Sequence, residues 1–164
     1  MKRRNILMAA AIGIVLALGA SAQSSTTTVT TSPGNYSRET TVTGPEGKTA
    51  TYQNNASWGN GTYVDNKSET GFSGRTATAS TTVSHAPGSA SRDTTVTGFD
   101  GKTRNYTSNA TWGNGAYNDT RTYTGRNGNT ATNTVTRSGG IVTNTVTGPK
   151  GNTRSYSHVA HGRR

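Results

Sequence analysis

Polar and apolar residues alternate in short runs between glycine-containing turns along most of the chain. The motif T-G-x-x-G-x-T occurs five times, beginning at Thr43, Thr70, Thr97, Thr124 and Thr147, so its start advances by 27, 27, 27 and then 23. A second series of turn signals alternates with it, at residues 59–61, 85–90, 113–115 and 138–140. Turns about 13 residues apart leave room for strands of about seven to ten residues, which is typical of an antiparallel meander.

The chemistry of the motif predicts how the strands of each hairpin pair. In residues 44–47 (Gly-Pro-Glu-Gly), proline suits the second position of a type I turn, and the last glycine suits a left-handed bulge residue. Such a loop sets Thr43 opposite Thr49 and Val42 opposite Ala50. Facing residues share a face, so one face holds Val42, Ala50, Tyr52, Ala56 and Trp58, and the other holds Thr41, Thr43, Thr49 and Thr51. The structural turn glycines are Gly44, Gly47, Gly71, Gly74, Gly98, Gly101, Gly125, Gly128, Gly148 and Gly151.

A longer repeat contains two such hairpins. Residues 38–66 and 92–120 are similar throughout, and residues 143–157 form a third, partial copy. The sequence therefore predicts an all-β fold, an antiparallel meander of about ten short strands in five tandem β-hairpins. Its form is left open between a repeat sheet, a solenoid and a thin sandwich. The predicted segments are a signal peptide (1–22), a flexible Ser/Thr-rich segment (23–36), a repeat domain (37–157, in copies 37–90, 91–140 and 141–157) and a polar basic tail (158–164).

The N-terminus has the pattern of a secretory signal. Three cations (residues 2–4) precede an apolar run from Ile6 to Leu18, and Ala20-Ser21-Ala22 provides small residues at a cleavage site. The run is too short to span a bilayer comfortably, so an uncleaved anchor is the less favoured alternative. We expect a secreted chain, periplasmic or extracellular, whose signal helix is removed and which then has no membrane span.

The expected mature chain has too few large apolar residues for a thick core. After residue 22 there is no leucine, and the chain holds only one isoleucine, two phenylalanines and nine valines, whereas threonine occurs 33 times. This composition leaves two possibilities, a disordered polar chain or a thin β-structure held largely by backbone pairing. No cysteine is present, so disulfides cannot support a secreted fold, and stability must come from the strand ladders, repetition or assembly.

The net charge favours acidic partners but does not identify one. Without the three signal cations the chain carries about +7, with histidine neutral. Acidic polysaccharide, lipopolysaccharide and other anionic surfaces are candidate partners, whereas no specific nucleic-acid motif is present. The charges are scattered singly along strands and turns, which favours plain solubility as their role.

The titratable residues do not form a recognisable catalytic or metal site. His158 and His161 have the spacing of half a metal site on a helix, but the segment has no helical pattern and no completing ligand. No His–acid pair singles out a nucleophile among the many hydroxyls, and the acids recur with the repeat. We therefore expect no enzyme activity, no metal and no cofactor.

Two aromatic patches are the most distinctive local features. Trp58 and Tyr63 flank one Gly-Asn-Gly turn, and Trp112 and Tyr117 flank the equivalent turn of the next long repeat. Such residues can stack on a sugar ring or a base. The alternative, which the scarcity of apolar residues favours, is that they bracket the turn and supply buried area.

These observations favour a secreted structural or adhesive protein that forms matrix, cell-surface or fibre material by β-strand stacking, through self-association. The second hypothesis is a binding module for an acidic polysaccharide, lipopolysaccharide or another anionic surface. A third, remote hypothesis follows from the recurring Thr-x-Thr runs, which in spacing resemble the ice-binding faces of β-solenoid antifreeze proteins; the favoured explanation is the good strand propensity of threonine on a solvated face.

Overall fold

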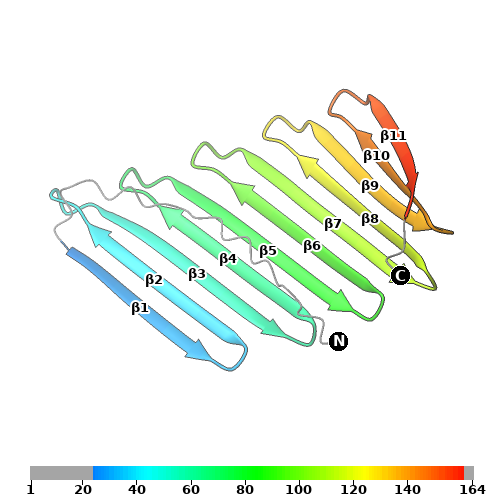
Figure 1. Ribbon diagram of the computed structural model, residues 1–164. Coiled ribbons are helices and arrows are strands. Elements are labelled where there is room, and N and C mark those ends of the chain that lie inside the picture. Colours follow the sequence, from blue (N-terminus) through cyan, green and yellow to red (C-terminus); the bar gives the residue numbers. More distant parts are fainter. Residues whose placement is uncertain (1–23, 161–164) are drawn as a thin grey trace.

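The computed structural model describes residues 24–160 as one open antiparallel sheet of eleven strands (Figure 1). The strands lie side by side in the order of the sequence, so each pairs with the strand before it and the strand after it. They are β1 (Ser24–Ser32), β2 (Asn35–Thr43), β3 (Thr49–Gly59), β4 (Thr62–Thr70), β5 (Thr76–Ala86), β6 (Ser89–Thr97), β7 (Thr103–Gly113), β8 (Ala116–Thr124), β9 (Thr130–Ser138), β10 (Ile141–Thr147) and β11 (Thr153–Val159).

This architecture confirms the predicted all-β meander and selects one open layer from the forms that the sequence left open. Within residues 24–160 every strand contacts only its sequence neighbours, so no second layer covers either face. The strand number is eleven rather than about ten, because residues 24–32 form β1 within the segment 23–36 that the sequence assigns to a flexible terminus. The predicted signal peptide (1–22) and the last residues of the predicted tail (161–164) lie outside the described residues.

Five T-G-x-x-G-x-T loops connect the hairpins at one end of the sheet. In the first, the Gly44 N–H donates to the Lys48 carbonyl at 2.8 Å, and the Gly47 N–H donates to the Gly44 carbonyl at 3.0 Å. Gly47 has a φ of 72°, the left-handed conformation of a bulge residue. The other four loops repeat both hydrogen bonds and the positive φ. Thr43 therefore faces Thr49 beside the first loop, as the turn chemistry predicts.

Two-residue turns close the hairpins at the opposite end of the sheet. Asn60 and Gly61 have φ values of 47° and 73°, the type I′ geometry that matches the twist of antiparallel strands. Asn114 and Gly115 repeat this geometry, with φ values of 48° and 75°. The Gly61 carbonyl also accepts a hydrogen bond from the His85 N–H of β5 at 2.7 Å, so a third strand holds this turn.

Alternation along the strands separates the side chains onto two faces. The pairing is continuous within each strand, so each face can be followed across the whole sheet. We call one the threonine face; it holds the even-numbered residues of β1, β4, β5, β8 and β9 and the odd-numbered residues of the other strands. Of the 33 threonines in the chain, 28 lie on it. The remaining strand residues form the second face, called the aromatic face for reasons given below.

Little apolar surface is buried in this single layer. The buried hydrophobic residues of the described part are Val42, Ala50, Ala77 and Ala79, all on the aromatic face. They are small or short residues that lie beside longer ones, as Ala79 lies opposite Lys67. Within residues 24–160 the strands contact only their neighbours in the plane of the sheet. Backbone ladders and cross-strand pairs therefore hold the sheet, in agreement with the thin core expected from composition.

The two Asn-Gly turns give a matched test of how the third strand constrains a turn. An added Cβ at Gly115 meets no atom within 4 Å, so we expect Gly115→Ala to cost about 1 kcal/mol, the strain of a left-handed alanine. An added Cβ at Gly61 collides with the backbone carbonyl of His85, so the turn or β5 must move. We expect Gly61→Ala to cost about 3 kcal/mol. Urea unfolding of both variants measures the difference, and equal costs would contradict the contact with β5.

Candidate functional site

The structure places the four aromatic residues singled out by the sequence in two separate patches on one face. Trp58 lies directly opposite Tyr63 on β3 and β4, and Trp112 lies opposite Tyr117 on β7 and β8. The patches are four strands apart, about 19 Å at the usual strand spacing, so they do not form one site. Trp58 is 49% exposed and Trp112 is 40% exposed, which leaves a large part of each ring accessible to a ligand.

The aromatic face contains every tryptophan and tyrosine of the chain. Sequence analysis singled out four of these nine residues and correctly placed Tyr52 on the face of Trp58; the register adds Tyr36, Tyr106, Tyr123 and Tyr156. The two phenylalanines, Phe72 and Phe99, lie in turn loops instead. Steps of two residues along the strands of Trp58 and Trp112 find Tyr52 and Tyr106, whereas Tyr36, Tyr123 and Tyr156 lie on other strands and need the pairing register.

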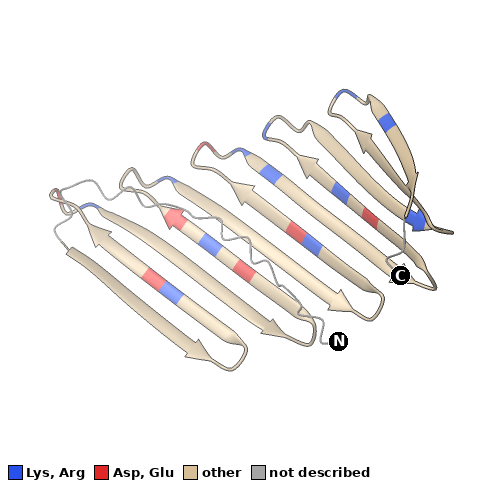
Figure 2. Ribbon diagram, viewed as in Figure 1, with Lys and Arg blue, Asp and Glu red and all other residues tan. Residues whose placement is uncertain are grey.

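The strand cations also lie on the aromatic face, which the scattered positions in the sequence did not suggest. All seven strand lysines and arginines are there, namely Arg38, Lys67, Arg92, Arg104, Arg121, Arg137 and Arg154. They lie on β2, β4, β6, β7, β8, β9 and β11, and further cations lie in the T-G-x-x-G-x-T loops (Figure 2). The charged strand residues on the threonine face are the two acids Glu39 and Asp93. The sheet therefore has one cationic aromatic face and one face of hydroxyls and amides that carries two acids.

Two of the strand cations are neutralised by equivalent ion pairs. Lys67 Nζ lies 2.8 Å from Asp65 Oδ2, and both side chains are only 12% exposed. Burial alone would lower the pKa of Lys67, but the hydrogen bond and charge of Asp65 outweigh it and raise this pKa. In the second repeat, Arg121 pairs with the buried Asp119 at 2.8 Å. The hydrogen bond to Asp119 raises the pKa of Arg121.

Tyrosines adjoin both ion pairs. Burial, followed by the charge of Asp65, raises the pKa of Tyr63, and burial with the charge of Asp119 does the same for Tyr117. Both phenols therefore remain neutral well above physiological pH. Each repeat contains an acid flanked along its strand by a neutral tyrosine and a cation.

The other five strand cations are all arginines without an ion pair in the described part of the chain. Among them, Arg92 lies over the ring of Tyr106, with its guanidinium carbon 5.6 Å from the ring centroid, and donates to Thr94 Oγ1 at 3.2 Å. These contacts fix the direction of the guanidinium without neutralising it. Arginine in this state can bind carboxylate, sulfate or phosphate oxygens in a bidentate manner.

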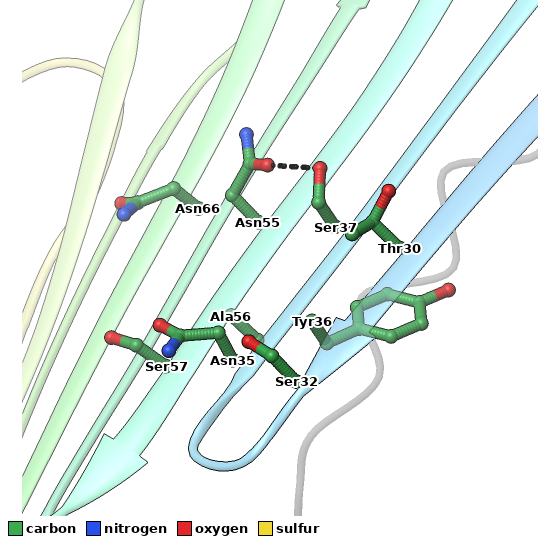
Figure 3. A pocket seen from close by; sticks show the side chains of 9 residues that line it. All are labelled: Thr30, Ser32, Asn35, Tyr36, Ser37, Asn55, Ala56, Ser57 and Asn66. Carbon is green, nitrogen blue, oxygen red and sulfur yellow. Dashed lines mark hydrogen bonds between the residues drawn. The ribbon is translucent and has the colours of Figure 1, made fainter.

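The threonine face offers neutral polar groups. A hollow of about 250 Å³ lies over β1 to β4 near their two-residue turns (Figure 3). Ser37 Oγ donates to Asn55 Oδ1 at 2.7 Å, and Asn66 lies opposite Asn55 on the next strand (Figure 3). Ser80 Oγ in turn donates to Asn66 Oδ1 at 2.7 Å. No charged side chain lines this hollow, so it can supply only neutral hydrogen-bonding groups.

The histidines do not meet a set of metal ligands within residues 24–160. His158 lies on the aromatic face of β11, and His161 lies outside the described residues. His85 instead contacts Trp112, with ring centroids 5.8 Å apart.

Comparisons with models of protein families, with curated proteins and with solved structures found no significant match to this chain. In the part of the chain that the structure describes, no helix could cross a membrane. The faces and edges of the sheet are therefore the basis for inferring a function.

One buried acid on the aromatic face provides a test of its electrostatics. Glu69 is 6% exposed, its Oε2 has no hydrogen-bond partner, and burial raises its pKa above the ordinary 4.5. The folded chain therefore holds this proton more tightly than the unfolded chain, so the free energy of unfolding falls as pH rises from about 4.5 through the folded pKa. We expect Glu69→Gln to remove this decline and to add about 1 kcal/mol at pH 7.

Urea unfolding at pH 4 and pH 7 measures the effect. Glu46→Gln is the control, because Glu46 lies exposed in a loop, paired with Lys48; its stability should change by less than about 0.5 kcal/mol. A Glu69→Gln protein that keeps the wild-type pH dependence would contradict the assignment.

Proposed function

We propose that this chain is an extracellular structural protein whose copies join edge to edge through β1 and β11. The observation that carries the proposal is the composition of β1, a nine-residue strand of sequence SSTTTVTTS. Within residues 24–160 no strand pairs with its outer edge. Proteins usually protect such an edge with charges, proline, a bulge or a short length, and β1 has none of these.

The turn geometry determines which backbone groups of β1 point outward. A two-residue turn makes Ser32 and Asn35 a hydrogen-bonded pair, and the bonding then alternates along the strand. The outward groups of β1 are those of Ser25, Thr27, Val29 and Thr31, which lie on the aromatic face. The same reasoning from the bulged loop before β11 assigns its outward groups to Thr153, Ser155, Ser157 and Val159, on the threonine face.

These assignments are compatible with a head-to-tail joint. Because the number of strands is odd, β1 and β11 run in the same direction, and a copy placed by translation pairs its β1 with β11 in parallel. In a parallel pair, a bonding residue of one strand forms hydrogen bonds with the two residues on either side of the residue directly opposite it. Because directly opposite residues share a face, the bonding residues of the two strands lie on opposite faces of the sheet. The outward groups of β1 and β11 meet this condition. The joint keeps both faces continuous and leaves new edges free, so it produces an open polymer.

Assembly would also compensate for the weak core. A single layer with four buried hydrophobic residues in its described part depends on its ladders, and every joined edge adds backbone hydrogen bonds without new apolar residues. The signal pattern at residues 1–22 supports an extracellular address, and because the chain has no cysteine, its stability depends on strand pairing rather than on disulfides.

Charges placed on the β1 edge should prevent polymer growth. We expect Thr26→Lys with Thr28→Lys to slow the concentration-dependent sedimentation of the purified chain, because edge lysines repel an incoming strand. The control, Thr78→Lys with Thr111→Lys, adds the same charge to exposed positions on the same face of interior strands. Val29→Pro is a second edge variant. It removes an N–H group that points outward from β1, and this N–H forms no hydrogen bond with β2.

Sedimentation velocity and electron microscopy give the readout. Wild-type and control protein should form long polymers, and both edge variants should remain small while keeping the wild-type circular dichroism spectrum. A wild-type monomer at high concentration would overturn the proposal, as would a discrete dimer, which would indicate closed pairing of two β1 strands.

A further inference from the structure

We propose that the aromatic face binds an acidic polysaccharide at a site in the second repeat, formed by Arg92, Arg104, Tyr106, Arg121 and Tyr123. Uronate carboxylates would pair with Arg92 and Arg104, which form no ion pair within residues 24–160, and sugar rings would stack on the tyrosines, while Arg121, paired with Asp119, borders the site. This goes beyond the proposed function, which concerns the edges of the sheet, and supplies the polymer with a surface partner.

The register brings these five residues together. Arg104 and Tyr106 are neighbours on one face of β7, and Tyr106 lies opposite Tyr123 on β8. Arg121 adjoins Tyr123 along β8, and Arg92 of β6 lies over the Tyr106 ring. Two adjacent rings are thus bordered by guanidinium groups on both sides along the strand direction. Tyr123 is 47% exposed and its ring is accessible to a ligand.

The first repeat has different residues at the positions equivalent to this site. Ala50 stands where the second repeat has Arg104, and Glu69 stands where it has Tyr123. Both first-repeat residues are buried, and all four buried hydrophobic residues of the described part belong to this repeat. The second repeat thus replaces a buried alanine and a buried acid with an exposed arginine and an exposed tyrosine. Such replacements weaken packing and create a cationic aromatic surface, which indicates a ligand.

Cations continue from this site in two rows across the strands. One row contains Arg38, Lys67 and Arg104, and the register aligns Arg92, Arg121 and Arg154 in the other. In both rows successive cations are two and then three strands apart, which is about 10 and 14 Å. A linear polymer lying across the strands would therefore meet a cation at each of these intervals, although the middle cation of each row, Lys67 or Arg121, is already paired with an acid.

This spacing suits a sparsely charged polymer. Duplex DNA carries one charge per about 1.7 Å of its axis, far denser than these rows. Asp65 and Asp119 share the aromatic face and already pair with Lys67 and Arg121, so this face has fewer free cations than a dense polyanion needs. A polysaccharide with one carboxylate per sugar, or fewer, matches the spacing better and also provides rings for stacking.

The test compares two variants with the same change of net charge. Arg92→Gln with Arg104→Gln removes two cations from the site, and Arg75→Gln with Lys102→Gln removes two loop cations that form no ion pair within residues 24–160. Mobility in native gels that contain polygalacturonate, compared with neutral dextran, gives the affinity. We expect about a tenfold loss for the site variant and less than about a twofold loss for the loop variant.

A second pair of variants tests stacking at constant charge. Tyr123→Ala should weaken binding to polygalacturonate about threefold, whereas Phe99→Ala, which removes an exposed ring from a loop, should have no effect. Circular dichroism establishes that each variant keeps the wild-type fold.

Three results would overturn the proposal. Equal losses for the site and loop variants would show attraction by net charge alone, and tighter binding to single-stranded DNA or heparin would show a preference for dense polyanions. No retardation of the wild-type chain would exclude the site. The edge variant Thr26→Lys with Thr28→Lys should still bind polygalacturonate, and the site variant should still polymerise, so the two proposals can fail separately.

Discussion

Every other property of this sheet depends on its turns, which keep the alternation of side chains between the two faces in step from one strand to the next. The bulged loop makes threonine face threonine, and the two-residue turn preserves the same alternation into the next strand. A shift of one residue at any turn would exchange the faces beyond it. The separation of nine aromatic and seven cationic residues from the 28 threonines therefore depends on ten consecutive turns.

The two long repeats share this framework but differ in what it holds. In the first, Val42 and Ala50 are buried and the charge of Lys67 is matched within the fold. In the second, Arg104 and Tyr123 are exposed at positions where the first has buried residues. A single layer has no interior in which to separate structural and binding residues. In the proposal above, these tasks are divided between the two repeats along the chain instead.

Local chemistry made much of the fold predictable. Glycine and proline positions identified the turns, and the bulged loop fixed the facing pair Val42 and Ala50, which the structure confirms. The choice of a single layer depends on long-range packing that no turn encodes, so the sequence left it open. β1 was not predicted, because its Ser/Thr run resembles a flexible terminus and its pairing with β2 decides its structure.

The candidate site was only partly predictable for a related reason. Trp58, Tyr63, Trp112 and Tyr117 stood out because they flank conspicuous turns. Arg92 and Arg104 had no aromatic neighbour next to them in the sequence. Arg92 lies beside Tyr106 only because the alternation of faces is preserved through the turn between β6 and β7. Isolated charges in a sequence can thus form a surface when the strands between them keep a strict alternation.

The position of Thr70 opposite Thr51 has a consequence for material built from this sheet. The loop before β3 ends at Thr49, and the next loop begins at Thr70, which lies opposite Thr51. Each loop on this side is therefore displaced by two residues along the strand direction relative to the one before it, and Thr97, Thr124 and Thr147 repeat this offset. The loops therefore form the stepped outline seen in Figure 1. The repeat advances by two residues along the strands for every two strands across the sheet. The direction of repetition is therefore inclined by about 35° from the perpendicular to the strands. A ribbon that continued this offset would have oblique strands, unlike the perpendicular strands of cross-β fibrils, and its strand-spacing reflection would lie away from the fibre meridian.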